Sequence, residues 1–215
     1  VAHNGYMYLM GGIGGGGGNT ILQDVQYAPI NSDGTLGAWL PAANNLPSAR
    51  FMHDAAAHNG YLYVTGGCTA LAALGGSAGR ICSNGGNINT VLYAQIQPDG
   101  NVGAWTAGTS FSGERSGHAS IVANGYLYII GGCNSVNGVG SCNGFMNDVQ
   151  FALLDSGNGS VGSWRVSDPF VQGRFGHRVT IKDGYMYVAG GFLTGDTVSG
   201  AVQYASISPS GTLSS

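Results

Sequence analysis

The sequence predicts an all-β fold rich in tight turns. Of its 215 residues 40 are glycine, whereas an average protein contains about 7% glycine. Charged residues make up 8% instead of about 25%, with Lys182 as the single lysine and Glu114 as the single glutamate. Long helices use these two residues heavily and are weakened by glycine. A hydrophobic content of 43% is too high for a disordered chain, so an all-β protein remains.

One ten-residue pattern occurs four times along the chain. Its copies are HNGYMYLMGG (3–12), HNGYLYVTGG (58–67), ANGYLYIIGG (123–132) and KDGYMYVAGG (182–191). Each copy joins an Asn-Gly or Asp-Gly turn to a Tyr-x-Tyr run and a Gly-Gly pair. Self-similarity at a spacing of this size is the signature of a repeat architecture.

Other landmarks accompany the pattern in a constant order. An R-x-x-H motif precedes the last three copies, at Arg50/His53, Arg115/His118 and Arg174/His177. A short apolar run follows each copy, as DVQYAPI (24–30), TVLYAQI (90–96), DVQFALL (148–154) and AVQYASI (201–207). A turn and a tryptophan come next, at Trp39, Trp105 and Trp164, whereas the fourth copy has SGTLSS without a tryptophan.

Each repeat predicts four short strands, here called a to d in chain order. Strand a follows R-x-x-H, and the Asn-Gly turn supplies the positive φ that a two-residue hairpin requires. Strand b carries the tyrosines, strand c is the VQYAPI-like run, and strand d surrounds the tryptophan. Four antiparallel strands per repeat describe a β-propeller blade. We expect blades at about 1–40, 50–106, 115–165 and 174–215, all in one region spanning 1–215.

At these residues the chain resembles the kelch family, and bacterial secreted kelch-like repeats in particular. The double glycine after an aromatic strand, the later tyrosine and the spaced tryptophan carry the resemblance, which covers essentially the whole chain. It implies a kelch-type β-propeller with about four blades in this span. Kelch propellers commonly have six or seven blades.

The first and last blades are expected to be incomplete. Only Val1 to His3 remain for the first strand a, and the fourth repeat stops before its tryptophan. Sheet edges left open invite pairing with another chain. We therefore expect part of a longer polypeptide; a four-bladed ring with imperfect closure, or a subunit completed by its neighbours in a polymer, are the alternatives.

The repeated residues are predicted to be structural. The Gly-Gly pairs allow a bend and a close backbone approach, and the Tyr-x-Tyr side chains should pack between blades. The tryptophans should clamp the outer strand against the next blade, and the repeated Arg and His should form blade-to-blade hydrogen bonds. Asp24 and Asp148 are expected where a strand begins, and Asp33 and Asp99 in turns.

Four cysteines form two local pairs, Cys68 with Cys82 and Cys133 with Cys142. A C-x-x-C metal spacing is missing from the sequence. We therefore predict two disulfides, 68–82 and 133–142, and an oxidising, extracellular or cell-surface location. The alternative is free buried thiols in a cytosolic protein.

The b–c connections vary most between repeats, at 12–23, 68–89, 133–147 and 192–200. Two of them carry the cysteine pairs, and a disulfide would staple each Gly-rich loop. The kelch resemblance implies that these loops share a binding face with the d–a loops at about 40–50, 106–115 and 165–174. We expect ligands on this face but cannot assign individual ligand-binding residues; plain solvent-exposed loops are the alternative.

Charge and hydropathy narrow the classes of partner. The net charge of −3 and the absence of a basic patch argue against nucleic-acid binding. No apolar run reaches the length of about 18 residues that a membrane helix needs, so membrane insertion is not expected. The partners that we still expect are further copies of the chain, which would form a homopolymer or another self-assembled structure, or a glycan ligand.

The sequence favours an extracellular structural or adhesive scaffold, such as a subunit of a filament, sheath or surface layer. A carbohydrate- or protein-binding module is the alternative, and a sugar-active enzyme, such as one resembling sialic-acid mutarotases, is less favoured. A glycosidase would need two carboxylates standing apart from the repeat, and the candidates are Asp54, Glu114, Asp168 and Asp196; a mutarotase would rely on Arg50, Arg115 or Arg174. We assign no catalytic, cofactor or metal residue and expect no cofactor.

Overall fold

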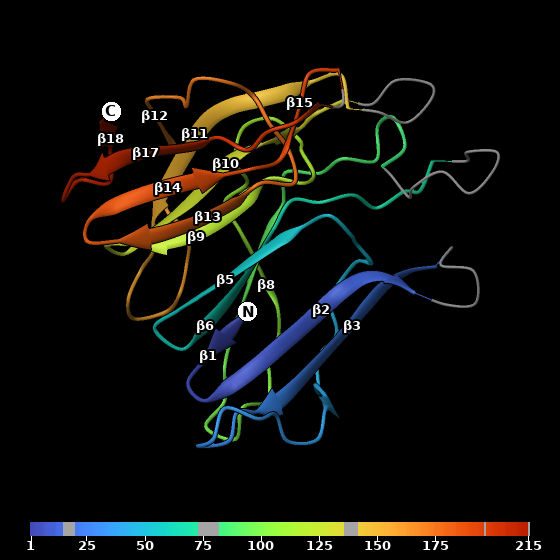
Figure 1. Ribbon diagram of the computed structural model, residues 1–215. Coiled ribbons are helices and arrows are strands. Elements are labelled where there is room, and N and C mark those ends of the chain that lie inside the picture. The colour runs from blue at the N-terminus through green and yellow to red at the C-terminus, as the bar shows by residue number, and fades with distance from the viewer. Residues whose placement is uncertain (15–19, 73–81, 136–141, 196, 215) are drawn as a thin grey trace.

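The computed structural model describes residues 1–14, 20–72, 82–135, 142–195 and 197–214. Regular structure in these residues is entirely β: four antiparallel four-stranded sheets and one two-stranded hairpin (Figure 1). Within these ranges, no helix could span a membrane. The expected all-β fold built from repeated four-stranded sheets is confirmed.

The four sheets follow one another along the chain and are called blades one to four. Blade one contains β1 (Ala2–His3), β2 (Tyr6–Gly14), β3 (Thr20–Pro29) and β4 (Leu40–Pro41). Blade two contains β5 (Asp54–His58), β6 (Tyr61–Thr65), β7 (Val91–Gln95) and β8 (Thr106–Gly108). Blade three contains β9 (Ala119–Ala123), β10 (Tyr126–Cys133), β11 (Phe145–Leu153) and β12 (Arg165–Ser167). Blade four contains β13 (Arg178–Lys182), β14 (Tyr185–Ala189), β17 (Val202–Ile207) and β18 (Leu213–Ser214), and β15 (Phe192–Leu193) pairs with β16 (Thr197–Val198).

The a–b hairpins owe their geometry to the repeated turn dipeptide. Asn59 and Gly60 have φ angles of 45° and 78°, so both turn residues lie in the left-handed region that a two-residue hairpin needs. Asn4-Gly5, Asn124-Gly125 and Asp183-Gly184 behave in the same way. The turn holds His58 opposite Tyr61 and sets the register of β5 and β6.

The Gly-Gly pair bends the second strand and brings it against the following blade. Gly66 has a φ of 52°, and a Cβ there would lie 2.9 Å from the Arg115 carbonyl oxygen of blade three. Only glycine tolerates both the conformation and the close approach. In blade three the pairing of β10 with β11 shifts register between Ile130 and Gly132, which marks a β-bulge at this bend.

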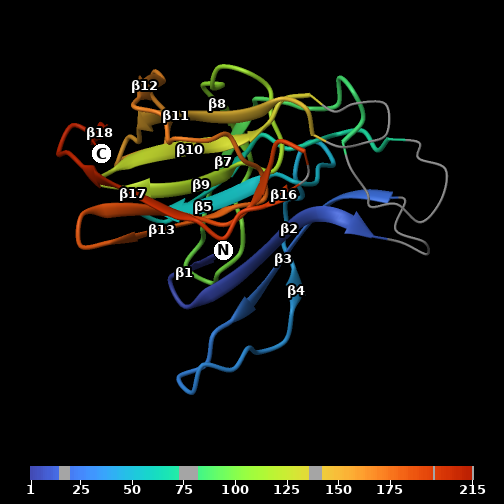
Figure 2. The same ribbon diagram turned by 45° about the horizontal axis from the view of Figure 1, so that its top comes forward.

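The hydrophobic core lies between blades rather than inside one sheet. One cluster joins blades one and two, around Tyr8 and Leu62, and a second joins blades two and three. A third, around Tyr128 and Met186, joins blades three and four. The first strands of successive blades, β1, β5, β9 and β13, contact one another in that order. Figure 2 shows β9 beside β5, with strands β2 to β4 of blade one below them. In the described ranges, no such cluster joins blade four to blade one.

Blades one and four, which the sequence predicts to be incomplete, each contain four strands. The additional strands, β1 and β18, contain two residues each. In β18, Leu213 pairs with Ile207, as Leu36 pairs with Ile30 in the c–d turn of blade one. Strand β18 is therefore the return of that turn, and blade four has no described counterpart of the outer strand that follows the tryptophan in other blades.

Candidate functional site

Three arginines are almost completely buried and act within their own blades. Each Nη1 donates to the carbonyl of the first glycine of its blade's Gly-Gly pair, at 3.2 Å for Arg50, 3.0 Å for Arg115 and 2.9 Å for Arg174. Burial lowers the pKa of Arg50 to about 10. The predicted blade-to-blade role is wrong for these side chains, because the guanidinium points along its own sheet to the start of the third strand.

The arginine backbone, in contrast, does connect blades. The second glycine of each of the first three Gly-Gly pairs donates its N–H to the arginine carbonyl of the next blade. These bonds measure 2.8 Å from Gly12 to Arg50, 3.0 Å from Gly67 to Arg115 and 2.9 Å from Gly132 to Arg174. The repeated arginines thus order both their own sheet and the contact with the preceding one.

The repeated histidines are buried near the same junctions. The Nε2 atom of His118 lies 2.9 Å from the Thr65 hydroxyl of the preceding blade. Burial, with the neighbouring arginines as a smaller cause, lowers the pKa of His118 to about 3 and those of His53 and His177 to about 4. All three imidazoles are therefore neutral at pH 7, which suits a role inside the packed blades.

Tyrosines of the second strands reach across to the next blade. The hydroxyls of Tyr8, Tyr63 and Tyr128 donate to the carbonyls of Gly100, Gly159 and Gly211, at 3.0, 3.0 and 2.7 Å. Each acceptor lies in the c–d turn of the following blade. The predicted packing of these tyrosines between blades is confirmed.

Trp105 and Trp164 contact the preceding blade, not the next one as expected, and Trp39 of blade one is 42% exposed. Trp105 of blade two donates from Nε1 to the Asn44 carbonyl of blade one at 3.2 Å. Trp164 of blade three donates to the Thr109 carbonyl of blade two at 2.8 Å. The direction differs because the fourth strand lies beside the d–a loop of the blade before it.

The carboxylates considered for catalysis lie on different parts of the fold. Asp54 begins β5 and accepts a hydrogen bond from the Ser120 backbone N–H at 2.5 Å, and burial raises its pKa. Glu114 and Asp168 are exposed on the d–a loops of blades two and three, and Asp196 lies outside the described residues. The described ranges contain no cluster of three or more His, Cys, Asp or Glu side chains that could hold a metal.

Two disulfides anchor the long b–c loops of blades two and three. Cys68 bonds to Cys82 and Cys133 to Cys142, and all four residues are buried. Parts of these loops, 73–81 and 136–141, lie outside the described residues, as do 15–19 of the blade-one loop. Since disulfides persist in oxidising compartments, the chain belongs outside the cytosol.

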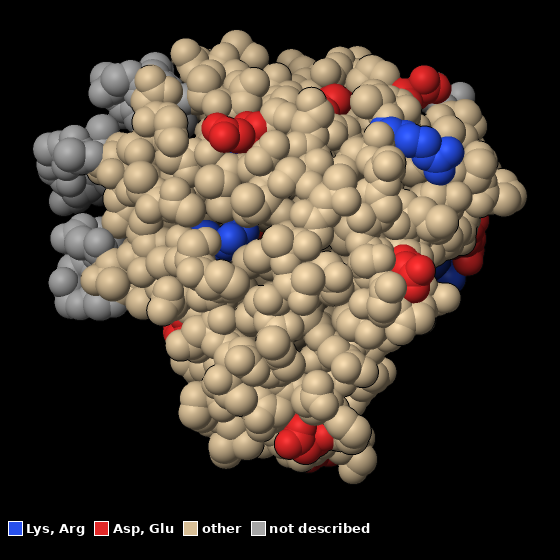
Figure 3. Space-filling model, turned by 180° about the vertical axis from the view of Figure 1, so that it is seen from behind, with Lys and Arg blue, Asp and Glu red and all other residues tan. Residues whose placement is uncertain are grey.

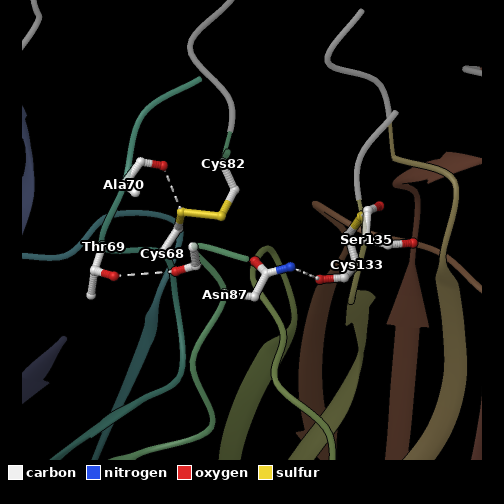
Figure 4. The surroundings of a disulfide bond; sticks show 8 residues. Cys68, Thr69, Ala70, Cys82, Asn87, Cys133 and Ser135 are labelled. Atoms are coloured by element: carbon white, nitrogen blue, oxygen red, sulfur yellow. Dashed lines mark hydrogen bonds between the residues drawn. A yellow bond between two sulfur atoms is a disulfide. The ribbon is translucent and has the colours of Figure 1, made fainter. Parts of the chain in front are cut away.

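The two anchored loops are joined directly to each other. Asn87, which follows the Cys68–Cys82 bridge, donates from Nδ2 to the Cys133 carbonyl at 3.3 Å (Figure 4). Asn87 itself is buried and also pairs with Cys68 through a β-bridge. The disulfide ends of the sheets in blades two and three thus form one connected face, which we call the loop face.

Comparison with known proteins identifies the repeat. Residues 114–150 match the family model of the Kelch motif; no curated protein matches the chain. The matched segment contains Arg115, His118, the Gly131-Gly132 pair and Asp148, and the structure shows that the sheet built by these residues recurs along the chain. The motif match shows a kelch repeat at residues 114–150, and the recurrence of the same four-stranded sheet along the described chain is consistent with a series of kelch β-propeller blades.

Proposed function

We propose that this chain is a structural module of an extracellular assembly, in which further copies pack through the contact that already joins its own blades. The disulfides support a location outside the cell. Kelch propellers generally bind proteins. The proposed role is not catalytic, which agrees with the engagement of the repeated arginines in hydrogen bonds inside their sheets.

The observation that carries this proposal is the pair of uncovered faces on blades four and one. Tyr204 of blade four is 66% exposed, whereas Phe151, at the same position of blade three, is 1% exposed. On blade one, Leu9 is 56% exposed, whereas Val64 at the same position of blade two is fully buried. The uncovered face of blade four is equivalent to the face of blade three that packs against blade four. The uncovered face of blade one is equivalent to the face of blade two that packs against blade one.

The hydrogen bonds of the junctions suggest how two copies would fit. Tyr187 occupies the position of Tyr8, Tyr63 and Tyr128, and no described residue accepts a hydrogen bond from its hydroxyl. Gly34 occupies the turn position of Gly100 and Gly159, and it has no described tyrosine partner. Packing of blade four of one copy against blade one of the next would repeat the same bond.

Scarce charge also favours dense packing. Isolated blue and red side chains interrupt an otherwise uncharged surface in Figure 3, and the net charge is −3. Long-range repulsion between copies is therefore weak. Large exposed apolar patches usually mark protein interaction sites.

The proposal is tested by sedimentation velocity on the purified protein, without ligand, over a wide range of concentrations. We expect association that increases with concentration and is reduced at least tenfold by Tyr204→Glu. Val166→Glu is the matched control, because Val166 is equally exposed but lies on the edge of blade three. A protein that remains monomeric at every concentration contradicts the proposal.

A second candidate function is glycan or protein binding at the loop face. The Asn87 bond between the two disulfide-anchored loops favours it, since a rigid surface loses less entropy on binding. A glycan array with the monomeric Tyr204→Glu variant tests this candidate. Retention that disappears when both disulfides are replaced by alanine pairs would support it, and an empty array would contradict glycan binding.

A further inference from the structure

Arg165, the first residue of β12, covers two aromatic rings at the junction of blades three and four. Its guanidinium carbon lies 4.6 Å from the centre of the Phe151 ring and 5.5 Å from that of the Tyr126 ring. Its Nη2 donates to the Ser210 carbonyl of blade four at 3.1 Å. Among the described residues this arginine has no carboxylate partner. We call this arrangement of two rings and one carbonyl oxygen a guanidinium seat.

The junction of blades two and three has the same pair of rings. Tyr61 and Tyr93 occupy the strand positions of Tyr126 and Phe151. Their ring centroids are 6.4 Å apart and their planes are tilted by 58°. The two rings below Arg165 are 5.6 Å apart and tilted by 70°. The aromatic part of the seat is therefore present between blades two and three.

The acceptor oxygen of the seat is present as well. A tyrosine hydroxyl of the preceding blade donates to the Gly159 carbonyl in one junction and to the Gly211 carbonyl in the other, so the two glycines are equivalent. Asn158 directly precedes the first of these glycines, as Ser210 precedes the second. Asn158 is exposed, and no described residue donates a hydrogen bond to its carbonyl. This oxygen can therefore accept a hydrogen bond from a ligand.

The side chain that would cover the rings is short in blade two. Tyr93 pairs with Thr106 as Phe151 pairs with Arg165, and a threonine cannot extend over two rings. A groove of about 270 Å³ lies here, lined among others by Tyr61, Tyr93, Thr106, Asn158, Gln95 and Gln97. The seat that an arginine fills in one junction is thus an open groove in the preceding one.

The charge around the groove favours a cation. Asp155, three residues before Asn158, is exposed, and its Oδ1 accepts hydrogen bonds from the backbone N–H groups of Gly157 and Asn158 at 2.8 and 3.0 Å. The equivalent turn beside Arg165 has Ser208 in place of this carboxylate. The described residues that line the groove include no lysine or arginine. An incoming cation would therefore meet a nearby carboxylate that the filled seat lacks.

We propose that this groove binds the guanidinium group of an arginine on a partner protein. The planar group stacks on Tyr61 and Tyr93, and one of its N–H groups donates to the Asn158 carbonyl. Its remaining N–H groups can donate to the amide oxygens of the two glutamines in the groove. The site lies at an internal junction and does not use the uncovered faces of blades one and four. It is therefore a contact additional to the proposed assembly.

The chemistry of the groove selects arginine over other side chains. A guanidinium is planar and weakly hydrated, so it stacks on aromatic rings, whereas the ammonium of lysine is compact and strongly hydrated. Citrulline has nearly the shape of arginine but no charge, and it lacks the attraction between a cation and an aromatic ring. One stacked group and a few exposed hydrogen bonds supply weak affinity, so we expect an isolated arginine to bind in the millimolar range.

The test titrates the isotope-labelled Tyr204→Glu variant with the peptide acetyl-Gly-Arg-Gly-amide and follows the backbone amide signals by NMR. We expect saturable shifts of the signals of Thr106, Asn158 and Gly159. The peptides with citrulline or lysine in place of arginine should bind at least fivefold more weakly. Failure to shift these signals at tens of millimolar peptide, or equal binding of either control peptide, would overturn the proposal. The variant is monomeric whether or not the wild type associates, so the result does not depend on the proposed assembly.

Two matched variants locate the binding site. Thr106→Arg would place an arginine of the chain itself in the groove, as Arg165 is placed in the next junction, and should weaken binding at least tenfold. Leu40→Arg is the same substitution at the equivalent position of blade one and should leave binding unchanged. Both positions are exposed, so neither change disturbs the core. Equal effects of the two substitutions would contradict the assigned site.

Arg165→Ala provides a second measurement, because it empties the filled seat. We expect this variant to bind a second arginine peptide, with saturable shifts of the Ser210 and Gly211 signals. Thermal unfolding of the same variant checks that the fold is retained. A folded variant that still binds a single peptide would contradict the equivalence of the two seats.

Discussion

Arg115 donates two hydrogen bonds to the Asp148 carboxylate, from Nη1 to Oδ1 at 2.6 Å and from Nη2 to Oδ2 at 2.9 Å. Arg115 precedes β9, and Asp148 lies within β11, three residues after its first residue, rather than at the beginning of the strand as the sequence predicts. Blades two and four place Thr90 and Ala201 at the Asp148 position, where Arg50 bonds to the Thr90 hydroxyl and Arg174 to the Ala201 carbonyl. Of the three arginines, Arg115 is therefore the one that forms an ion pair within the described residues.

Asp148→Asn should lower the free energy of unfolding by about 3 kcal/mol, because the buried charge of Arg115 would lose its counterion. Thr90→Ala, the matched change in blade two, removes one neutral partner of Arg50 and should lower it by about 1 kcal/mol. Urea denaturation of both variants measures the difference. Equal effects would show that the ion pair does not govern the stability of blade three.

Tyr128→Phe should lower the free energy of unfolding by about 1 kcal/mol. The lost hydroxyl donates to the Gly211 carbonyl at 2.7 Å in a buried junction, and burial raises the pKa of Tyr128 to about 12. Tyr187→Phe, at the same position of blade four, should change stability by less than about 0.5 kcal/mol in the monomer. Thermal unfolding at low protein concentration compares the two, and a larger loss for Tyr187→Phe would contradict the assignment of the uncovered face.

Replacing either disulfide by an alanine pair should lower the free energy of unfolding by about 3 kcal/mol. The reason is the loss of loop-closure constraint in the unfolded chain, for sequence separations of 14 and 9 residues. Denaturation of the two double variants beside the wild type measures the effect. Unchanged stability would mean that the sheets alone hold these loops.

Acid should destabilise the protein between about pH 6.5 and pH 4. In the folded state burial holds the pKa of His53 and His177 near 4 and that of His118 near 3, whereas an unfolded histidine has a pKa of about 6.5. The unfolded chain therefore binds more protons in this range, so stability falls as pH decreases.

Unfolding free energies measured at pH 7, 6, 5 and 4.5 test this expectation. His118→Gln should flatten the pH dependence, because one buried imidazole no longer resists protonation. Val166→Ala, at an exposed position on the outer strand of blade three, serves as the control and should leave the slope unchanged. A slope that is the same in all three proteins would show that other groups cause the acid sensitivity.

Much of the fold was predictable because its signals are local. The Asn59-Gly60 dipeptide is typical of a turn with positive φ angles. The Gly66-Gly67 pair likewise adopts positive φ angles, which residues other than glycine rarely adopt. Cys68 and Cys82 lie close in sequence and are bonded in the structure. The turn dipeptide and the Gly-Gly pair recur in all four repeats, so the four sheets could be predicted from the sequence without knowledge of their contacts.

The roles of other residues could not be predicted, because they depend on which blade lies beside which face. The sequence placed Trp164 against the next blade, yet it contacts Thr109 of the preceding one. Asp148 was expected simply to begin a strand, and its pairing with Arg115 spans 33 residues. Such partners are chosen by the packing of sheets, which no local pattern specifies.

The sequence by itself determined the β-strand units, their order and their turns, because backbone conformation at glycine, asparagine and tyrosine positions is set by neighbouring residues. Only the tertiary structure shows in which blades a repeated residue finds its hydrogen-bond or packing partner. Tyr128 donates to the Gly211 carbonyl of the next blade, whereas the equivalent Tyr187 has no acceptor among the described residues. Equivalent residues differ in this way because a hydrogen bond or a buried ring needs a partner across a junction, and that junction exists only in three dimensions.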